Sequence, residues 1–134
     1  MANKKTNSKL VDTNTYIDML YMTPEEVTAK DIKTLLENES SLDFELWEEM
    51  NVLELILPNK NSIDFDPLEV NFKDPSDASF VKNRRIKTIF AINVAETDLP
   101  TVIPYFEQIV NKFTGFLCAD TEDFNPVYVG TSKM

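Results

Sequence analysis

Acidic side chains are concentrated between residues 37 and 69, where they alternate with large apolar residues. This segment holds ten carboxylates and a single cation, Lys60, and so contains nearly all of the formal net charge of −10. Carboxylates at this density could attract a basic surface of another protein, ligate a hard cation such as Ca²⁺ or Mg²⁺, or act as general acids and bases. Solubility alone does not require such clustering, because the rest of the chain is close to neutral.

The predicted binding surface combines carboxylates of this segment with its tryptophan. Opposite charge would steer a basic partner toward the surface, and a large aromatic side chain could anchor the contact. For Trp47 itself we favour a core position, since tryptophan is on average highly buried. The predicted partner-binding residues are Glu45, Trp47, Glu48, Glu49, Asp64, Asp66 and Glu69.

Positive charge is concentrated in one short cluster. Its functional interpretation is a site for a small anion or a phosphopeptide beside a central strand. The alternative, which we favour, is a group of cations at a helix end that pairs with the surplus carboxylates. The candidate anion-site residues are Lys82, Arg84, Arg85 and Lys87.

The chain lacks the residues from which most common catalytic and cofactor sites are built. The chain has no histidine, one cysteine and two glycines. Without histidine there is no imidazole base, and one cysteine is too few for a zinc or iron–sulfur site within one chain. Gly115 and Gly130 belong to no glycine-rich phosphate loop. We therefore predict that the protein is not an enzyme and carries no cofactor.

Two acidic clusters are candidates for metal binding, and we expect neither to hold a metal. Asp64 and Asp66 would point to one side of a strand while Pro67 displaces Glu69, and this segment lacks the glycine and the loop frame of an EF-hand. The acids of residues 120–123 lie in an expected surface turn, where such groups are usually only solvated.

The first 14 residues contain little to bury, so we expect a disordered tail over residues 1–14. Residues 15–134 have the size of one domain, and a hydrophobic content of 43% is enough for one core. Cys118 has no partner and lies in an apolar run, which indicates a buried structural thiol. The N-terminus lacks the apolar region of a secretory signal, so a cytoplasmic protein is expected.

The negative charge of the chain also disfavours some classes of binding partner. It repels nucleic-acid phosphates and anionic lipids, so direct nucleic-acid binding and membrane binding are disfavoured. No stretch of the sequence is apolar over the length of a membrane span. The remaining partner class is a basic surface of another protein.

The first expected helix covers residues 23–38. Thr23 is a capping residue, Pro24 suits the first helical position, and Glu26 completes a capping box. The preceding residues, 16–22, are expected to form either a short helix of their own or a lead-in packed on the same face.

A three-stranded antiparallel meander should follow this helix. Apolar residues alternate with acidic ones, which is typical of strands buried on one face. Pro67 interrupts the last strand and marks a bulge or an edge position. The expected strands cover residues 42–46, 52–57 and 63–72, and the loop between the last two covers residues 58–62.

The C-terminal half should contain a short helix, a central strand and a long helix. Asp74 is a cap and Pro75 suits the first turn of the short helix. Residues 86–94 are apolar on both faces, which indicates a covered central strand. Residues 99–113 are apolar at three- and four-residue steps and predict the long helix, after which 116–119 and 127–129 form short strands.

This order of elements predicts an α+β fold. We expect a two-layer sandwich in which a mostly antiparallel sheet, the meander plus the central strand, is packed by the long helix of the C-terminal half. The strand–helix–strand segment over residues 86–119 is long enough for a right-handed crossover, which would make the sheet mixed.

We predict a non-enzymatic acidic protein-binding module, an inhibitor or immunity-type protein that occludes a basic site. Bacterial immunity proteins, small inhibitors and nucleic-acid mimics act in this way, an analogy of charge and size without a shared motif. One alternative is a ligand-binding or regulatory domain with a pocket between the sheet and the helix at 99–113. Another is a structural protein that assembles through a strand edge. We expect a monomer or a weak dimer.

Overall fold

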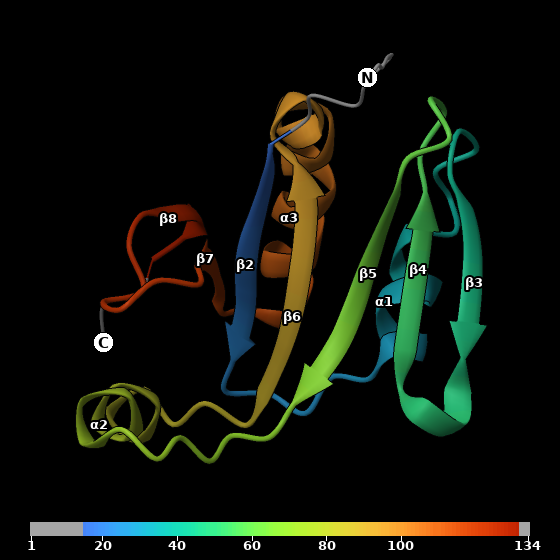
Figure 1. The fold of residues 1–134 in the computed structure, drawn as a ribbon. Coiled ribbons are helices and arrows are strands. Elements are labelled where there is room, and N and C mark those ends of the chain that lie inside the picture. The colour runs from blue at the N-terminus through green and yellow to red at the C-terminus, as the bar shows by residue number, and fades with distance from the viewer. Residues whose placement is uncertain (1–14, 132–134) are drawn as a thin grey trace.

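The computed structural model describes residues 15–131, and their strands form one seven-stranded sheet in which all neighbouring strands are antiparallel. The strands follow the order β3-β4-β5-β6-β2-β7-β8 (Figure 1). Their bounds are β2 (Tyr16–Thr23), β3 (Asp43–Trp47), β4 (Val52–Ile56), β5 (Ser62–Leu68), β6 (Thr88–Ala95), β7 (Phe116–Ala119) and β8 (Val127–Gly130). The tail predicted over residues 1–14 lies outside the described residues.

Helices cover the two faces of the sheet unequally. They are α1 (Ala29–Leu36), α2 (Pro75–Asn83) and α3 (Leu99–Phe113), with short 3-10 turns η1 (Glu48–Met50) and η2 (Glu96–Asp98). In Figure 1, α1 and α3 lie behind the sheet, whereas α2 lies at one end of the molecule. The predicted α+β fold class is confirmed. Within residues 15–131, no helix is both long and apolar enough to cross a membrane.

The prediction of a short helix or a lead-in over residues 16–22 is wrong, because this segment is β2, near the middle of the sheet. It pairs with β6 along its whole length and with β7 over its second half. Met19 and Tyr21 face the larger core, and Leu20 faces the smaller one. A short apolar run fits a strand buried on both faces as well as it fits a helix, so periodicity did not separate the two.

The first helix begins later than predicted. Its cap is Thr28, whose hydroxyl accepts a hydrogen bond from the Asp31 N–H (3.1 Å), while the Asp31 carboxylate accepts one from the Thr28 N–H (2.9 Å). Thr23 instead ends β2, and its buried hydroxyl donates to the Phe113 carbonyl (2.8 Å), which ties the strand to the end of α3. Both threonines precede an acidic residue at the capping-box spacing, so the local sequence fits either start.

The meander of β3, β4 and β5, the helices α2 and α3, and the strands β6, β7 and β8 are confirmed. The prediction of a bulge or an edge-strand position at Pro67 is wrong, because β5 lies between β4 and β6 and its register with β6 runs through Pro67 without a shift. Proline is tolerated there because β4 pairs with β5 only as far as Phe65, which leaves Pro67 paired on one side alone. The prediction of a mixed sheet is wrong, because all neighbouring strands are antiparallel. Since β2 lies between β6 and β7, the strand–helix–strand unit joins strands that are not neighbours.

Two apolar cores lie on opposite faces of the sheet. The larger one, under α1 and α3, includes the ring contacts Phe65–Phe90 (centroids 6.1 Å apart) and Phe65–Phe106 (5.6 Å). The smaller one lies under α2 and contains Cys118, which is buried as predicted. Burial, with a smaller effect of Asp120, raises the pKa of the Cys118 thiol to about 12, as suits an unreactive structural residue.

Beyond α2, no helix among residues 15–131 covers the second face of the sheet. Ile89 of β6 is buried beneath α2, but Asn93, farther along the same strand, is exposed. The prediction that this central strand is covered on both faces is therefore right only near α2. We call the uncovered surface of β3, β4, β5, β6 and β2 the open face, and it is turned toward the viewer in Figure 1.

Candidate functional site

Three carboxylates lie side by side on the open face of the meander. Glu45 on β3 pairs with Glu54 on β4, and Glu54 pairs in turn with Asp64 on β5. Directly paired residues share a face, and neighbouring strands are only about 4.8 Å apart, so these like charges confront one another. Asp66 follows on the same side of β5, opposite Ala91 of β6.

The line of polar side chains continues across the other half of the sheet. Asn93 on β6 pairs with Asp18 on β2, and its side-chain amide donates to the Asp18 carboxylate (Nδ2 to Oδ1, 2.6 Å). Asp120, directly after β7, donates its backbone N–H to the Asp18 carbonyl (2.9 Å) and so lies beside it. We call this line the acidic row, with Asn93 between its two halves; its carboxylates are Glu45, Glu54, Asp64, Asp18 and Asp120.

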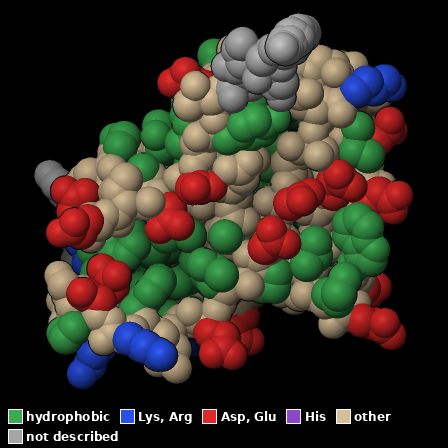
Figure 2. All heavy atoms as spheres, in the orientation of Figure 1, with side chains coloured by type: hydrophobic (Ala, Val, Ile, Leu, Met, Phe, Trp, Pro, Cys, Tyr) green, Lys and Arg blue, Asp and Glu red, His purple; other side chains and the backbone are tan. Residues whose placement is uncertain are grey.

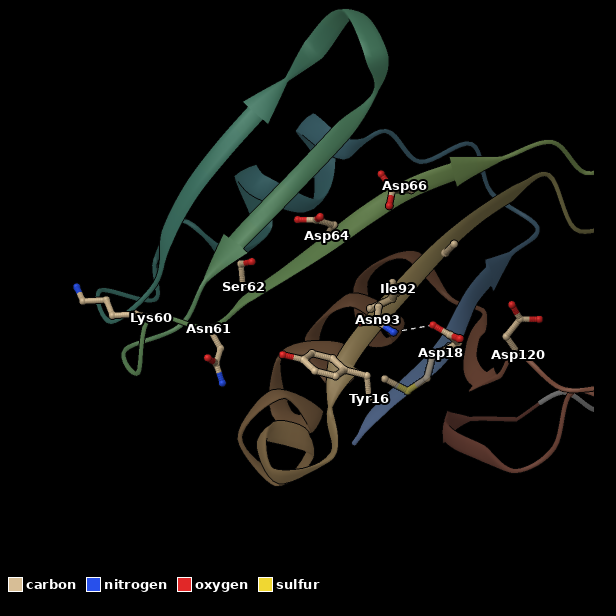
Figure 3. Close-up of a pocket in the computed structure, with 12 residues that line it drawn as sticks. Tyr16, Asp18, Lys60, Asn61, Ser62, Asp64, Asp66, Ile92, Asn93 and Asp120 are labelled. Carbon is tan, nitrogen blue, oxygen red and sulfur yellow. Dashed lines mark hydrogen bonds between the residues drawn. The ribbon is translucent and has the colours of Figure 1, made fainter. Parts of the chain in front are cut away.

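A hollow of about 530 Å³ lies in the middle of the open face. Figure 3 shows Asp64 and Asp66 on β5 along one side of it. Asp18 and Asp120 line the other side, and Asn93 lies between the two sides (Figure 3). In the space-filling view, Asp and Glu side chains are spread across this face, whereas Lys and Arg side chains lie at its margins (Figure 2).

Burial and repulsion perturb two of these carboxylates. Burial raises the pKa of Asp64 above its ordinary value, and the charges of Glu54 and Asp66 raise it further. Burial also raises the pKa of Asp120, with a further increase from Asp18. The ionised form of both groups is therefore disfavoured in the folded protein, as occurs where a cluster of charges lacks a compensating cation.

The salt bridges between described residues lie elsewhere. Lys30 pairs with Glu48 (3.6 Å), and Lys33 pairs with Glu37 (2.9 Å). Neither salt bridge involves a carboxylate of the acidic row. Lys60, in the loop between β4 and β5, lines the hollow at its margin.

Four of the predicted partner-binding residues come together on the open face: Glu45, Trp47, Asp64 and Asp66. The core position that we favoured for Trp47 is wrong, because its side chain is 42% exposed. Trp47 belongs to the edge strand β3 and pairs with Val52, on the side of the sheet that α1 and α3 leave uncovered.

The other three predicted residues lie outside the acidic row. Glu48 and Glu49 form the turn η1 after β3, where Glu48 pairs with Lys30 of α1. Glu69 follows the end of β5 and is exposed. These carboxylates add to the negative field but do not line the hollow.

Sequence reasoning did not assign Asp18, Glu54 and Asp120 to the surface. Asp18 was missed because β2 was not identified as a strand. Glu54 interrupts an apolar run, and only the strand register places it between Glu45 and Asp64. The predicted hairpin loop at residues 58–62 would have set Glu54 opposite Asp66, whereas the observed pairing of Leu57 with Asn61 shortens the loop and sets Glu54 opposite Asp64.

The cations of the predicted anion site are divided between two environments. Lys82, Arg85 and Lys87 line a second hollow near α2. Arg84 instead lies over the Phe80 ring (guanidinium carbon to ring centroid, 3.6 Å) and donates to the Phe80 carbonyl (3.1 Å). The hollow is not the expected pocket between the sheet and α3, since no residue of α3 lines it.

Within residues 15–131, no group of three or more His, Cys, Asp or Glu residues is arranged to hold a metal ion. The carboxylates of the open face extend along a row across several strands, and a row suits an extended basic surface better than a single ion. Comparison of the chain with protein-family models, curated proteins and solved structures finds no match. Function is therefore inferred from the geometry and charge of the open face itself.

Proposed function

We propose that the protein binds a basic surface of another protein through its open face and inhibits that partner by occluding the surface. The observation that carries this proposal is the acidic row, in which like charges occupy paired positions on neighbouring strands. Such a field speeds the association of a basic partner and disfavours neutral or acidic ones.

The free protein bears an unrelieved repulsion along the acidic row. Like charges directly opposite one another in a sheet are destabilising. The pairs Glu45–Glu54 and Glu54–Asp64 are of this kind. A partner's Lys or Arg side chains would remove this repulsion and form charge-assisted hydrogen bonds, so the feature that destabilises the free fold favours the complex.

Two exposed aromatic residues flank the charges and supply apolar contact area. Trp47 is 42% exposed on β3, and Tyr16, at the start of β2, is 50% exposed and lines the hollow. Trp and Tyr dominate the binding energy of many protein interfaces, where they are surrounded by polar groups. The open face therefore combines steering charge with anchors, as an inhibitor surface requires.

The proposal is tested with a variant in which three carboxylates of the acidic row become isosteric amides: Asp18→Asn, Glu54→Gln and Asp64→Asn. The matched control removes the same charge elsewhere, at the exposed residues Glu26, Glu107 and Glu122, by substitution with Gln. Both variants and the unaltered protein are immobilised and exposed to nuclease-treated lysate at low and at high salt. Captured proteins are identified by mass spectrometry, and their affinities are then measured with purified components.

We expect the unaltered protein and the control to retain the same basic protein at low salt and to lose it at high salt. The variant with Asp18→Asn, Glu54→Gln and Asp64→Asn should fail to retain this basic protein at either salt concentration. Equal retention by the two triple variants would place the interface elsewhere, and capture of no basic protein would contradict the proposal.

A further inference from the structure

The second hollow, of about 520 Å³, lies at the C-terminal end of α2, away from the acidic row. Apart from Asn71, its lining residues are of two kinds. The apolar part comes from α2 and from the segments on either side of it, and the charged part consists of cations. The lining residues that matter here are Val70, Phe72, Val81, Lys82, Arg85, Ile86 and Lys87.

Arg85 occupies a backbone position that usually belongs to glycine. Its φ of 56° is in the left-handed region. The Arg85 N–H donates to the Lys82 carbonyl (3.1 Å), and the Ile86 N–H donates to the Val81 carbonyl (3.0 Å). These bonds define a Schellman motif, in which the left-handed residue is commonly glycine because a Cβ is disfavoured there. An arginine at this position bears backbone strain that glycine would relieve, as do the other non-glycine residues with positive φ, Asn51, Lys60, Thr114 and Phe124.

The same turn builds both parts of the hollow. Val81 and Ile86, which the 3.0 Å hydrogen bond of the motif joins, are 5% and 7% exposed and form an apolar wall. Lys87 is fixed by its N–H, which donates to the Thr23 carbonyl at the end of β2 (2.9 Å). The cations are therefore presented from a rigid, hydrogen-bonded turn, beside the apolar wall.

Helix capping does not account for this arrangement. A cation in the last turn, such as Lys82, suits the helix dipole. It does not require an arginine in the left-handed position. In the described part of the chain, neither Lys30–Glu48 nor Lys33–Glu37 brings a carboxylate to these cations.

We propose that this hollow binds a small amphipathic anion: a phosphate or carboxylate group held by Arg85 with Lys82 and Lys87, and an aromatic or aliphatic body held against Val81 and Ile86. The planar guanidinium group matches a phosphate or a carboxylate through paired hydrogen bonds. The volume is in the range of small-ligand sites. This site is independent of the partner-binding role of the open face, because the two surfaces have opposite charge and share no lining residue.

The first test is a titration of the full chain with naphthyl phosphate, followed by two-dimensional amide NMR. We expect saturable shifts at residues 70–72 and 78–87, which surround the hollow. Naphthol lacks the anion and inorganic phosphate lacks the apolar body, so each should bind at least about tenfold more weakly. The absence of saturable shifts, shifts centred on the open face, or equal binding of inorganic phosphate would overturn the proposal.

The second test uses Arg85→Gly, which removes the cation and relieves the left-handed strain. We expect Tm to rise by a few degrees and the affinity for naphthyl phosphate to fall about tenfold. Lys112→Gln, which removes a cation on α3 outside the hollow, should leave the affinity unchanged. Lys82→Gln supplies a second variant that keeps the turn and should also weaken binding. Unchanged affinity in Arg85→Gly or in Lys82→Gln, or a lower Tm in Arg85→Gly, would overturn the proposal.

Discussion

The side-chain amide of Asn93 lies 2.6 Å from the carboxylate of Asp18, its paired residue on the neighbouring strand. Asn93 thus places a neutral hydrogen-bond donor between the two halves of the acidic row. A carboxylate at this position would make the row of negative charges continuous. The hydrogen bond satisfies Asp18 and separates it from the carboxylates of β5. An amide at this position limits the repulsion that the open face imposes on the fold.

Asn93→Asp should therefore destabilise the protein at neutral pH by about 0.5–1.5 kcal/mol, because it exchanges a hydrogen bond for a repulsive pair. The loss should shrink in acid, where carboxylates are protonated. Urea denaturation at both pH values measures the effect. Asn93→Ala removes the hydrogen bond without adding charge, so it should cost less than Asn93→Asp at neutral pH; an equal cost would show that repulsion contributes nothing.

The raised pKa values on the open face predict a particular pH dependence. Since Asp64 and Asp120 have higher pKa values in the folded protein than in the unfolded chain, the folded protein binds protons more tightly. Their contribution to the free energy of unfolding therefore falls as pH rises above the ordinary value of 3.8, and the full penalty is present above the raised pKa.

Asp64→Asn removes one of these penalties. We expect the variant to be more stable than the unaltered protein at neutral pH and to lose this advantage below pH 3.8, the ordinary Asp pKa. Urea denaturation midpoints at the two pH values provide the measurement. Asp43→Asn, on the same face but opposite Ile56, is the control for loss of one negative charge. A stability difference for Asp64→Asn that does not change with pH would contradict the raised pKa of Asp64 in the folded protein.

The elements that were predicted correctly are those whose pattern is local. The alternation over β3 and β5 shows one buried face, and the three- and four-residue steps of α3 show a buried stripe. β2 lacks such a signal, because continuous apolar residues from Met19 to Met22 fit a strand or a helix equally. Thr23 and Thr28 likewise both fit a helix cap, and tertiary contacts decide between them.

The candidate site was only partly predictable for the same reason. The acidity of residues 37–69 is evident in the sequence, but the pairing that turns it into a row is a long-range property. Asp18 reaches the row only because β2 inserts between β6 and β7. The exposure of Trp47 could have been predicted, because the alternation of Phe44 and Leu46 with acidic residues places Trp47 on the acidic face of β3.

A buried carboxylate joins the loop between β4 and β5 to the start of α3. Asp98 is 5% exposed, and its two oxygens accept hydrogen bonds from the side-chain amides of Asn59 and Asn61, both at 2.8 Å. Asp98→Ala should cost about 1.5–3 kcal/mol, the range for hydrogen bonds to a charged group. In a double-mutant cycle, Asn59→Ala and Asn61→Ala should each cost much less in the Asp98→Ala background. Additive losses, measured by urea denaturation, would show that these bonds do not stabilise the fold.

Trp47 provides a direct measurement of the field over the open face, because it is the single tryptophan and its side chain is 42% exposed. The carboxylates around it should concentrate a cationic quencher and exclude an anionic one. Caesium should therefore quench its fluorescence more efficiently than iodide, relative to the same two quenchers acting on free N-acetyltryptophanamide. The difference should decrease with added salt and in the variant with Asp18→Asn, Glu54→Gln and Asp64→Asn. It should persist in the control altered at Glu26, Glu107 and Glu122. An iodide efficiency equal to that of caesium would mean that the acidic row does not dominate the potential at this residue.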